Sequence, residues 1–508
     1  MAGYRQPSNK AVFRRLWSIS VAVVLGIAPA FQFGPLYVRT ASAATGDIGY
    51  QDGSTSGTGS SSATGEKPES KLWFTQDNIW WSWMWNGSRY DIARLDPTTH
   101  SWMLQGLNIS ETRGDSRADA LYDPQTSKLD VGSHTFAGAS SSATTGNPSL
   151  LFQFTYSTST QHWSLDSGYP SQINNTSSET MVIDKDSTGR IWATWTQEDT
   201  VYVNWTTTST NTWATPIALP VAAAKGLAPD DISTLVSYEN KSRIGILWSD
   251  QTASAQGTAL YFASIAAGAS DPSSSSSWTG VTAYGPGPGF ADDHLNIKSL
   301  DSDGSGRVYA VVKTSANDQG NNPSATQIAL LWRSAGGTWS MTTVGRVQDC
   351  HTRPVLVLDP AHSLLHVYLT APAGACHVSG YAGTIYEKTA NLDSPSFASG
   401  RSTPVIRDAA SQNLNNVTTT KQEITAGSGI VLLASNSVTQ RYWHAEESIG
   451  TPPPSSGISV VSQTSTVSPA TTAATIVESS GAIAGDVLVA SLTVVNINFK
   501  LALPHLLG

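Results

Sequence analysis

The sequence predicts an all-β protein built as a seven-bladed β-propeller, with a six-bladed ring and one degenerate unit as the alternative. One pattern of short apolar runs recurs seven times between positions 71 and 444. Turn-forming residues separate the runs within each unit. A repeat of roughly 45–70 residues that holds four short strands is typical of a propeller blade.

Each unit opens with a polar residue, which precedes a short apolar run, a tight turn and a second apolar run. The turns between the two runs are rich in Asp, Pro, Gly and Ser, as in 122–127 and 184–189. These residues favour tight hairpins. The seven opening residues are Lys71, Arg117, Glu179, Asp231, His294, Arg353 and Lys421.

A third apolar run follows in every unit, and in the first six units a fourth run begins with an aromatic residue. These aromatics, which we expect to pack between blades, are Trp102, Trp163, Trp213, Trp278, Trp339 and Phe397. The seventh unit has no fourth run before the prolines at 452–454. A propeller must close its ring or expose a strand edge. We therefore expect segment 48–52 to complete the last blade.

Composition at the two ends predicts the domain organisation. Residues 1–43 combine basic residues, an apolar stretch and an Ala-Ser-Ala site, and predict a signal peptide, with an uncleaved anchor as the alternative. Residues 44–66 are expected to be a flexible lead-in with a possible ring-closing strand, and 67–450 the propeller. A Pro-rich linker at 451–457 and a partial, truncated Ig-like β-sandwich module at 458–508 follow.

The charge balance excludes several partners. The chain has 508 residues and a formal net charge of −9. Residues 1–43 hold five basic residues and no acidic ones, so their removal would take the charge to −14. An acidic exported protein is a poor ligand for nucleic acid or anionic membranes. We expect a secreted or cell-surface monomer that inserts into no membrane after signal removal.

The opening residues predict a site at the mouth of the central channel, because the first strand of every blade lines that channel. Strand alternation adds residues two positions further on. The mixture of cations and carboxylates suits a charged or polar saccharide, and purely structural polarity is the alternative. The expected binding residues are Lys71, Arg117, Asp119, Glu179, Asp231, Asp293, Lys298 and Lys421.

The densest motifs, 292–298 and 350–353, provide the candidate catalytic residues His294, His351 and Arg353. A histidine near carboxylates can act as a general base, and an arginine can hold a substrate carboxylate through two hydrogen bonds. One histidine beside two adjacent acids is weak spacing for zinc. We therefore expect no metal and no cofactor.

The two cysteines, Cys350 and Cys376, both fall in the sixth unit, on loops of the same face. In an exported chain this placement predicts one disulfide. The bond would hold the 371–383 loop over the mouth. A catalytic Cys–His pair is the alternative.

The turns at 184–192 and 301–309 resemble degenerate Asp-box turns of the BNR/sialidase-like propeller superfamily. Residues 67–446 are also similar to a group of exported bacterial propeller proteins of unsettled activity, through segments such as 116–119, 292–294 and 351–354. The resemblance implies a fold and an extracellular setting, without a reaction. Arg117 and Arg353 match two of the three sialidase arginines, and no third arginine opens a blade.

Together these observations predict an exported propeller that binds a polysaccharide or glycoconjugate at its charged channel mouth. If the protein also cleaves the glycan, it is a hydrolase or a polysaccharide lyase. The alternative is a non-catalytic cell-surface, adhesion or protein-interaction scaffold. The sequence leaves the choice between them open.

Overall fold

The structure is a computed structural model that describes residues 46–58, 63–65, 67–207, 209–252, 257–300, 304–317, 322–372 and 382–449. The expected signal peptide, the Pro-rich linker and the C-terminal β module lie outside the described residues. The Asp-box-like turn at 301–303 and Cys376 also lie outside them.

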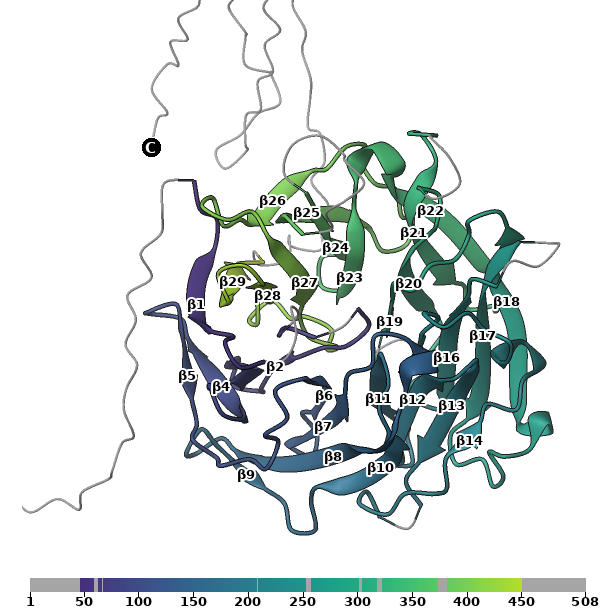
Figure 1. The fold of residues 1–508 in the computed structure, drawn as a ribbon, viewed down its shortest axis with the longest axis horizontal. Coiled ribbons are helices and arrows are strands. Elements are labelled where there is room, and N and C mark those ends of the chain that lie inside the picture. The colour runs from purple at the N-terminus through teal and green to yellow at the C-terminus, as the bar shows by residue number, and fades with distance from the viewer. Residues whose placement is uncertain are drawn as a thin grey trace, which may run out of the picture.

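Seven antiparallel sheets form a ring in the described chain, so the predicted β-propeller is confirmed with seven blades (Figure 1). Blade 1 contains β2 (Leu72–Phe74), β3 (Trp80–Trp85), β4 (Tyr90–Asp96) and β5 (Ser101–Leu104). Blade 2 contains β6 (Ser116–Asp123), β7 (Lys128–Thr135), β8 (Thr145–Ser157), β9 (His162–Leu165) and β10 (Ser171–Thr176). Blade 3 contains β11 (Met181–Lys185), β12 (Ile191–Gln197), β13 (Thr200–Trp205) and β14 (Ile217–Ala218).

The remaining blades repeat the four-stranded pattern. Blade 4 contains β15 (Ser233–Tyr238), β16 (Arg243–Asp250), β17 (Thr258–Ala266) and β18 (Trp278–Gly287). Blade 5 contains β19 (Leu295–Ser299), β20 (Val308–Lys313), β21 (Thr326–Arg333) and β22 (Trp339–Arg346). Blade 6 contains β23 (Thr352–Asp359), β24 (Leu364–Ala371), β25 (Thr384–Asn391) and β26 (Thr403–Ile406). Blade 7 contains β27 (Leu414–Thr418), β28 (Ile430–Asn436), β29 (Arg441–Glu447) and β1 (Tyr50–Ser54).

Helical structure in the described chain is confined to four single 3₁₀ turns: η1 (Ser140–Ser142), η2 (Ala222–Ala224), η3 (Ser275–Ser277) and η4 (Val347–Asp349). None of the helices in these residues is long and apolar enough to span a membrane.

The ring is closed by the N-terminal strand β1, which pairs antiparallel with β29, so that Tyr50 lies opposite His444. This strand overlaps segment 48–52, where the sequence places a ring-closing strand. The pairing is reinforced by an ion pair of 2.7 Å between Asp52 Oδ2 and His444 Nδ1. Strands from the two ends of the described chain therefore share one blade.

Aromatic side chains pack blades 1 and 2 against each other. Trp163 is buried, and its ring meets those of Trp73 and Trp81 edge-on at centroid distances of 5.8 and 5.7 Å. Such pairs contribute about 0.5–1.5 kcal/mol each beyond their burial. The expected packing role of the outer-strand aromatics is seen again for Trp278, which is also buried.

Polar side chains on the innermost strands cap backbone N–H groups of neighbouring blades. Asp119 accepts hydrogen bonds from the amides of Ser70 (2.9 Å) and Ile183 (2.8 Å). Asp184 and Asn296 accept from Ser237 (2.7 Å) and Leu356 (3.1 Å) in the same way. Buried backbone donors need such partners, so part of the channel polarity is structural.

Four residues differ from the strand positions that the sequence predicts. Lys421 does not open the first strand of blade 7, because β27 ends at Thr418. Trp163 is the second residue of β9, and the outer edge of blade 2 is completed by β10. Trp213 and Phe397 precede their outer strands, β14 and β26, instead of starting them. The apolar pattern therefore located the blades but not every strand end.

Candidate functional site

The centre of the ring is occupied by the segment that precedes β2, which reaches inward in Figure 1. Residues 63–65 and 67–71 of this segment are buried. The Pro68 carbonyl accepts a hydrogen bond from Asn296 Nδ2 at 3.4 Å, and Glu69 pairs with His134 Nε2 at 2.6 Å. The mouth is therefore built from this segment as well as from the blades.

The most concentrated group of ionisable side chains at the mouth lies where β19 begins. His294 Nδ1 is 2.5 Å from Asp292 Oδ1 and 2.6 Å from Asp293 Oδ1. Lys313 Nζ forms an ion pair with Asp292, and Lys67 Nζ forms ion pairs with Asp293 and Glu179. We call Asp292, Asp293, His294, Lys67, Lys313 and Glu179 the mouth cluster.

The mouth cluster fixes the state of His294. Carboxylate oxygens accept hydrogen bonds, so Nδ1 carries a proton and the neutral ring has its lone pair on Nε2. Nε2 is buried and has no hydrogen-bond partner among the described residues. Burial alone would raise the pKa of Asp293, but its interactions with His294 and Lys67 outweigh this effect and hold that pKa well below its ordinary value.

A second group of predicted residues lies along the channel wall. Lys421 reaches inward from the loop after β27, and its Nζ bonds Asp119 and the carbonyl oxygen of Ile183. Lys298 Nζ donates to Ser70 Oγ at 3.3 Å. Burial, together with the nearby charge of Lys421, lowers the pKa of Lys298 to about 7. Lys298 and Lys421 also line a cavity of about 40 Å³, which is room for very few water molecules.

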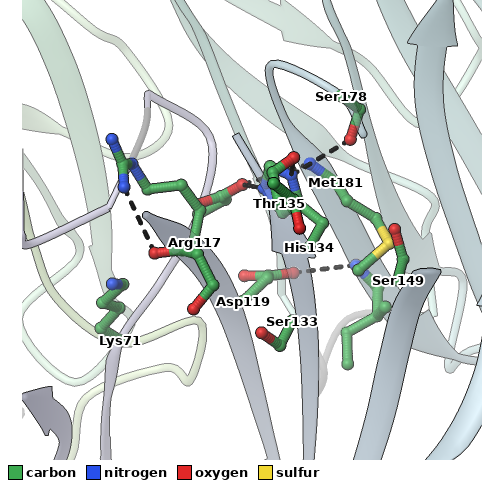
Figure 2. A network of polar contacts seen from close by, with 12 residues as sticks. Lys71, Arg117, Asp119, Ser133, His134, Thr135, Ser149, Ser178 and Met181 are labelled. Atoms are coloured by element: carbon green, nitrogen blue, oxygen red, sulfur yellow. Dashed lines mark hydrogen bonds and ion pairs between the residues drawn. The ribbon is translucent and has the colours of Figure 1, made fainter. Parts of the chain in front are cut away.

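Lys71 and Arg117 are buried between blades 1 and 2. Lys71 Nζ donates to the Ala63 carbonyl oxygen at 3.1 Å and lies 5.1 Å from the centre of the Tyr90 ring. The Arg117 guanidinium folds back onto the carbonyl oxygens of Asp115 and Ser116, both at 3.2 Å (Figure 2). The side chains of Lys71 and Arg117 are therefore packed within the protein and are not exposed to solvent.

Asp231 forms hydrogen bonds with the loops beside it. Its carboxylate accepts hydrogen bonds from the backbone amides of Ala228 and Gln251, at 2.8 and 3.0 Å. Burial raises the pKa of Asp231 to about 6. The predicted binding residue thus ties the segment before β15 to the loop after β16.

His351 and His294 do not share a centre. His351 packs on Gly345 of β22, where a Cβ would lie 2.7 Å from its Nδ1. Strand β22 is the outer strand of blade 5 and β19 the inner one, which places three strand spacings, about 14 Å, between them. Burial and the charge of Lys388 lower the pKa of His351 to about 4, so its ring is neutral.

The backbone around His351 is unusual. Cys350 and Arg353 both have left-handed conformations, with φ of 58° and 51°. The strand β23 carries an irregularity between Thr352 and Val355. Such bulges re-aim side chains and often lie near functional sites. Arg353 therefore keeps its place as a candidate, whereas the predicted Cys350–Cys376 disulfide extends beyond the described residues.

A separate cavity of about 280 Å³ lies at the rim, beside the ring-closing strand β1. Trp85, Trp102, Tyr442 and His100 contribute to its lining. Aromatic walls of this kind are common in ligand pockets. The site prediction did not include this cavity, because its walls come from both ends of the chain.

Lys67 and Lys313 were missing from the predicted binding residues. Lys67 lies in the charged stretch 66–71, but the residues it pairs with are in blades 3 and 5, and Asp293 is separated from it by 226 positions. Lys313 ends β20 directly beside the start of β19. The sequence indicated the position of Lys313 only through the predicted hairpin of the fifth unit, in which the end of the second strand lies beside the start of the first.

No protein-family model matches the chain, and no curated protein is significantly similar to it. Several solved structures are similar at low identity. A polysaccharide lyase is 12% identical over 76% of this chain and 88% of its own, with a TM-score of 0.37. An α-L-arabinofuranosidase from Fusarium graminearum is 9% identical over 69% and 98%, with a TM-score of 0.41. The hydrazine synthase of Kuenenia stuttgartiensis is 10% identical over 75% and 96%, with a TM-score of 0.44.

Propeller architecture is thus the part of the stated resemblance that the structure confirms. Membership of the BNR/sialidase-like superfamily stays a prediction. In the described Asp-box-like turn, Asp186 bonds its own loop and accepts a hydrogen bond from Trp192 Nε1 at 2.9 Å. This arrangement accounts for the turn by local hairpin chemistry.

Proposed function

We propose that the protein is an exported propeller that binds a polysaccharide or glycoconjugate at the channel mouth, around Asp293 and His294. We further propose that His294 is the proton acceptor if the bound glycan is cleaved. The single observation that supports this is the orientation of His294, which is held through Nδ1 by two carboxylates while Nε2 has no hydrogen-bond partner in the described structure.

A histidine oriented in this way is suited to general-base catalysis. The carboxylates fix the tautomer and stabilise the imidazolium that forms when Nε2 takes a proton. Nε2 is buried, so a substrate reaches it only when a neighbouring part of the mouth shifts. An anionic sugar would offer Lys67 a new partner in place of Asp293 and so favour that shift.

The second candidate is a non-catalytic binding or adhesion scaffold. It is supported by the ion pairs of the mouth cluster, which already neutralise Asp292, Asp293 and Glu179 within the protein. In that case the partner binds elsewhere, and the aromatic cavity beside β1 is the first alternative surface.

The two candidates can be separated with the purified exported protein and a panel of alginate, hyaluronan, polygalacturonate, xylan and arabinan. Binding is measured by calorimetry, and cleavage by reducing-end and unsaturated-uronate release. The variant His294→Asn keeps an N–H donor for the carboxylates but removes the base. His162→Gln, an exposed histidine on β9, is the matched control.

We expect cleavage to fall by about 10²–10⁴-fold in His294→Asn, with the control unchanged. Binding without release, weakened by Asp293→Asn, would identify a glycan-binding module at the mouth. Binding that survives both substitutions but is lost in Trp102→Ala would move the site to the rim cavity. No binding to any polysaccharide would reject the proposal and favour the scaffold.

A further inference from the structure

A second histidine–carboxylate cluster lies between blades 6 and 7, away from the residues that the sequence singled out. His366 and Tyr368 are two positions apart on β24, so they share one face of the strand. Glu387 lies opposite Tyr368 on β25, and Glu447 ends β29 of the next blade. We call His366, Glu387 and Glu447, with Tyr368 beside them, the blade 6–7 cluster.

The donor atoms of the blade 6–7 cluster converge. His366 Nδ1 lies 2.7 Å from Glu387 Oε1, and Tyr368 Oη donates to Glu447 Oε2 at 2.6 Å. One ligand atom from each of His366, Glu387 and Glu447 lies within 4.8 Å of the other two. Three donors bound to one ion at about 2.0–2.2 Å lie about 3.3–3.8 Å apart in tetrahedral or trigonal geometry, so the side chains would readjust to bring all three to bonding distance.

The charge of this cluster is not balanced by lysine or arginine. Within the described chain, the ion pairs of Glu387 and of the neighbouring Asp359 are made with His366 and His362 alone, and Glu447 has none. Glu387 and Glu447 lie close enough for their negative charges to repel each other. Two carboxylates thus face each other in a partly dry site that lacks a permanent cation.

The second ring nitrogen of His366, Nε2, is also available for an interaction. His366 is 6% exposed, and its Nε2 forms no hydrogen bond in the described structure. The closest acid to Nε2 is Asp359, whose Oδ2 is 3.8 Å away and which bonds His362 Nδ1 at 2.7 Å. Both ring nitrogens of His366 therefore face carboxylates, so the ring can ligate through one nitrogen and be oriented through the other.

We propose that His366, Glu387 and Glu447 bind a divalent transition-metal ion, of the class of Zn²⁺ or Mn²⁺, that joins blade 6 to blade 7. Imidazole and carboxylate together are ligands for such ions. When the ion binds Nδ1, the neutral ring carries its single proton on Nε2, which faces Asp359, and the proton that occupied Nδ1 passes to solvent as Nε2 takes one up. Tyr368, by donating to Glu447 Oε2, holds that carboxylate in place for the ion. Ca²⁺, which prefers oxygen ligands, should bind less well.

The test measures metal content and thermal stability of the purified chain after chelator treatment, using ZnCl₂, MnCl₂ and CaCl₂ as probes. The variants are His366→Gln and Glu387→Gln, which keep side-chain volume and hydrogen-bonding capacity. Asp293→Asn, in the lysine-containing mouth cluster, is the matched control. Metal content of the folded fraction is read after gel filtration, so a destabilised variant still gives an answer.

We expect one ion of Zn²⁺ or Mn²⁺ per chain in the wild type and in Asp293→Asn, and an increase of about 3 °C in Tm at a hundred times the Kd. His366→Gln and Glu387→Gln should lose at least tenfold in affinity and the Tm increase with it. Wild-type protein that retains no metal, or equal retention in all variants, would overturn the proposal.

Discussion

The mouth cluster and the blade 6–7 cluster each contain a histidine whose Nδ1 lies within 2.7 Å of a carboxylate, with a second carboxylate close by. They differ in their cations. Lys67 and Lys313 pair with the carboxylates of the mouth cluster, whereas no lysine or arginine among the described residues pairs with those of the blade 6–7 cluster. The same residue types are therefore placed under opposite charge conditions.

This difference decides what each cluster can do. Lysines that neutralise Asp292 and Asp293 compete with any metal ion, and this favours the proton-acceptor role that we propose for His294. Without lysines, Glu387 and Glu447 gain most from an external cation, because burial without a counter-charge is costly. In these two proposals the neighbouring cations, rather than the residue types, separate a proton-accepting histidine from a metal-binding one.

The largest effect is expected from removing the shared lysine of the mouth cluster. Lys67→Met removes an ion pair from each of the buried carboxylates of Glu179 and Asp293, which should lower the free energy of unfolding by about 3 kcal/mol. Urea unfolding at pH 7 measures the loss. Lys67→Arg is the control and should retain most of the stability. A loss below 1 kcal/mol in Lys67→Met would mean that the lysine does not neutralise these carboxylates.

A third histidine cluster sharpens the comparison through its pH dependence. His444 faces Asp52 of the ring-closing strand and Glu446, with the rings of Tyr50 and His100 nearby. Burial opposes protonation, but the two carboxylates raise the pKa of His444 to about 9. Here the histidine itself is the cation.

Because the folded pKa of His444 exceeds its unfolded value, its contribution is complete below about pH 6.5 and is lost as the pH rises through about 9. We expect wild-type stability to fall by about 2 kcal/mol more than that of His444→Gln between pH 6.5 and 9.5. Parallel pH profiles of the two proteins would show that His444 is not the group responsible.

The smallest effect should have the opposite sign. In metal-free protein, Glu447→Gln removes one of two facing carboxylates and keeps an acceptor for Tyr368. We expect the free energy of unfolding to rise by about 1 kcal/mol at pH 8, measured by urea unfolding in the presence of chelator. Zn²⁺ should then stabilise the wild type and not the variant. Destabilisation of the metal-free variant would contradict the charge imbalance assigned to this cluster.

The fold was predictable because blade strands are local. Short apolar runs, hairpin turns and the aromatic outer strands recur at regular spacing, and they identify seven blades without knowledge of the contacts between them. The residues at the centre were less predictable. Asp293 and His294 could be found from their own motif, whereas Lys67 is 226 positions from Asp293 and reaches it through a segment with no strand pattern.

Other differences have the same physical origin. Asp231 and Asp119 were predicted as ligand-binding residues because they open a unit or lie two positions beyond its opening residue, and that role stays a prediction. Both also accept hydrogen bonds from backbone amides, a role that depends on the strands and loops around them. Lys421 was assigned to a strand start, yet it reaches the channel from the loop after β27. The blade 6–7 cluster joins residues of two blades, so no spacing in the sequence indicates it.

The most direct measurement of the contrast between the two clusters is an anomalous difference map, collected at the zinc absorption edge from crystals grown with Zn²⁺. The account predicts one peak between His366, Glu387 and Glu447, and none at Asp292, Asp293 and His294. A peak at the mouth cluster, or the absence of a peak between blades 6 and 7, would contradict it.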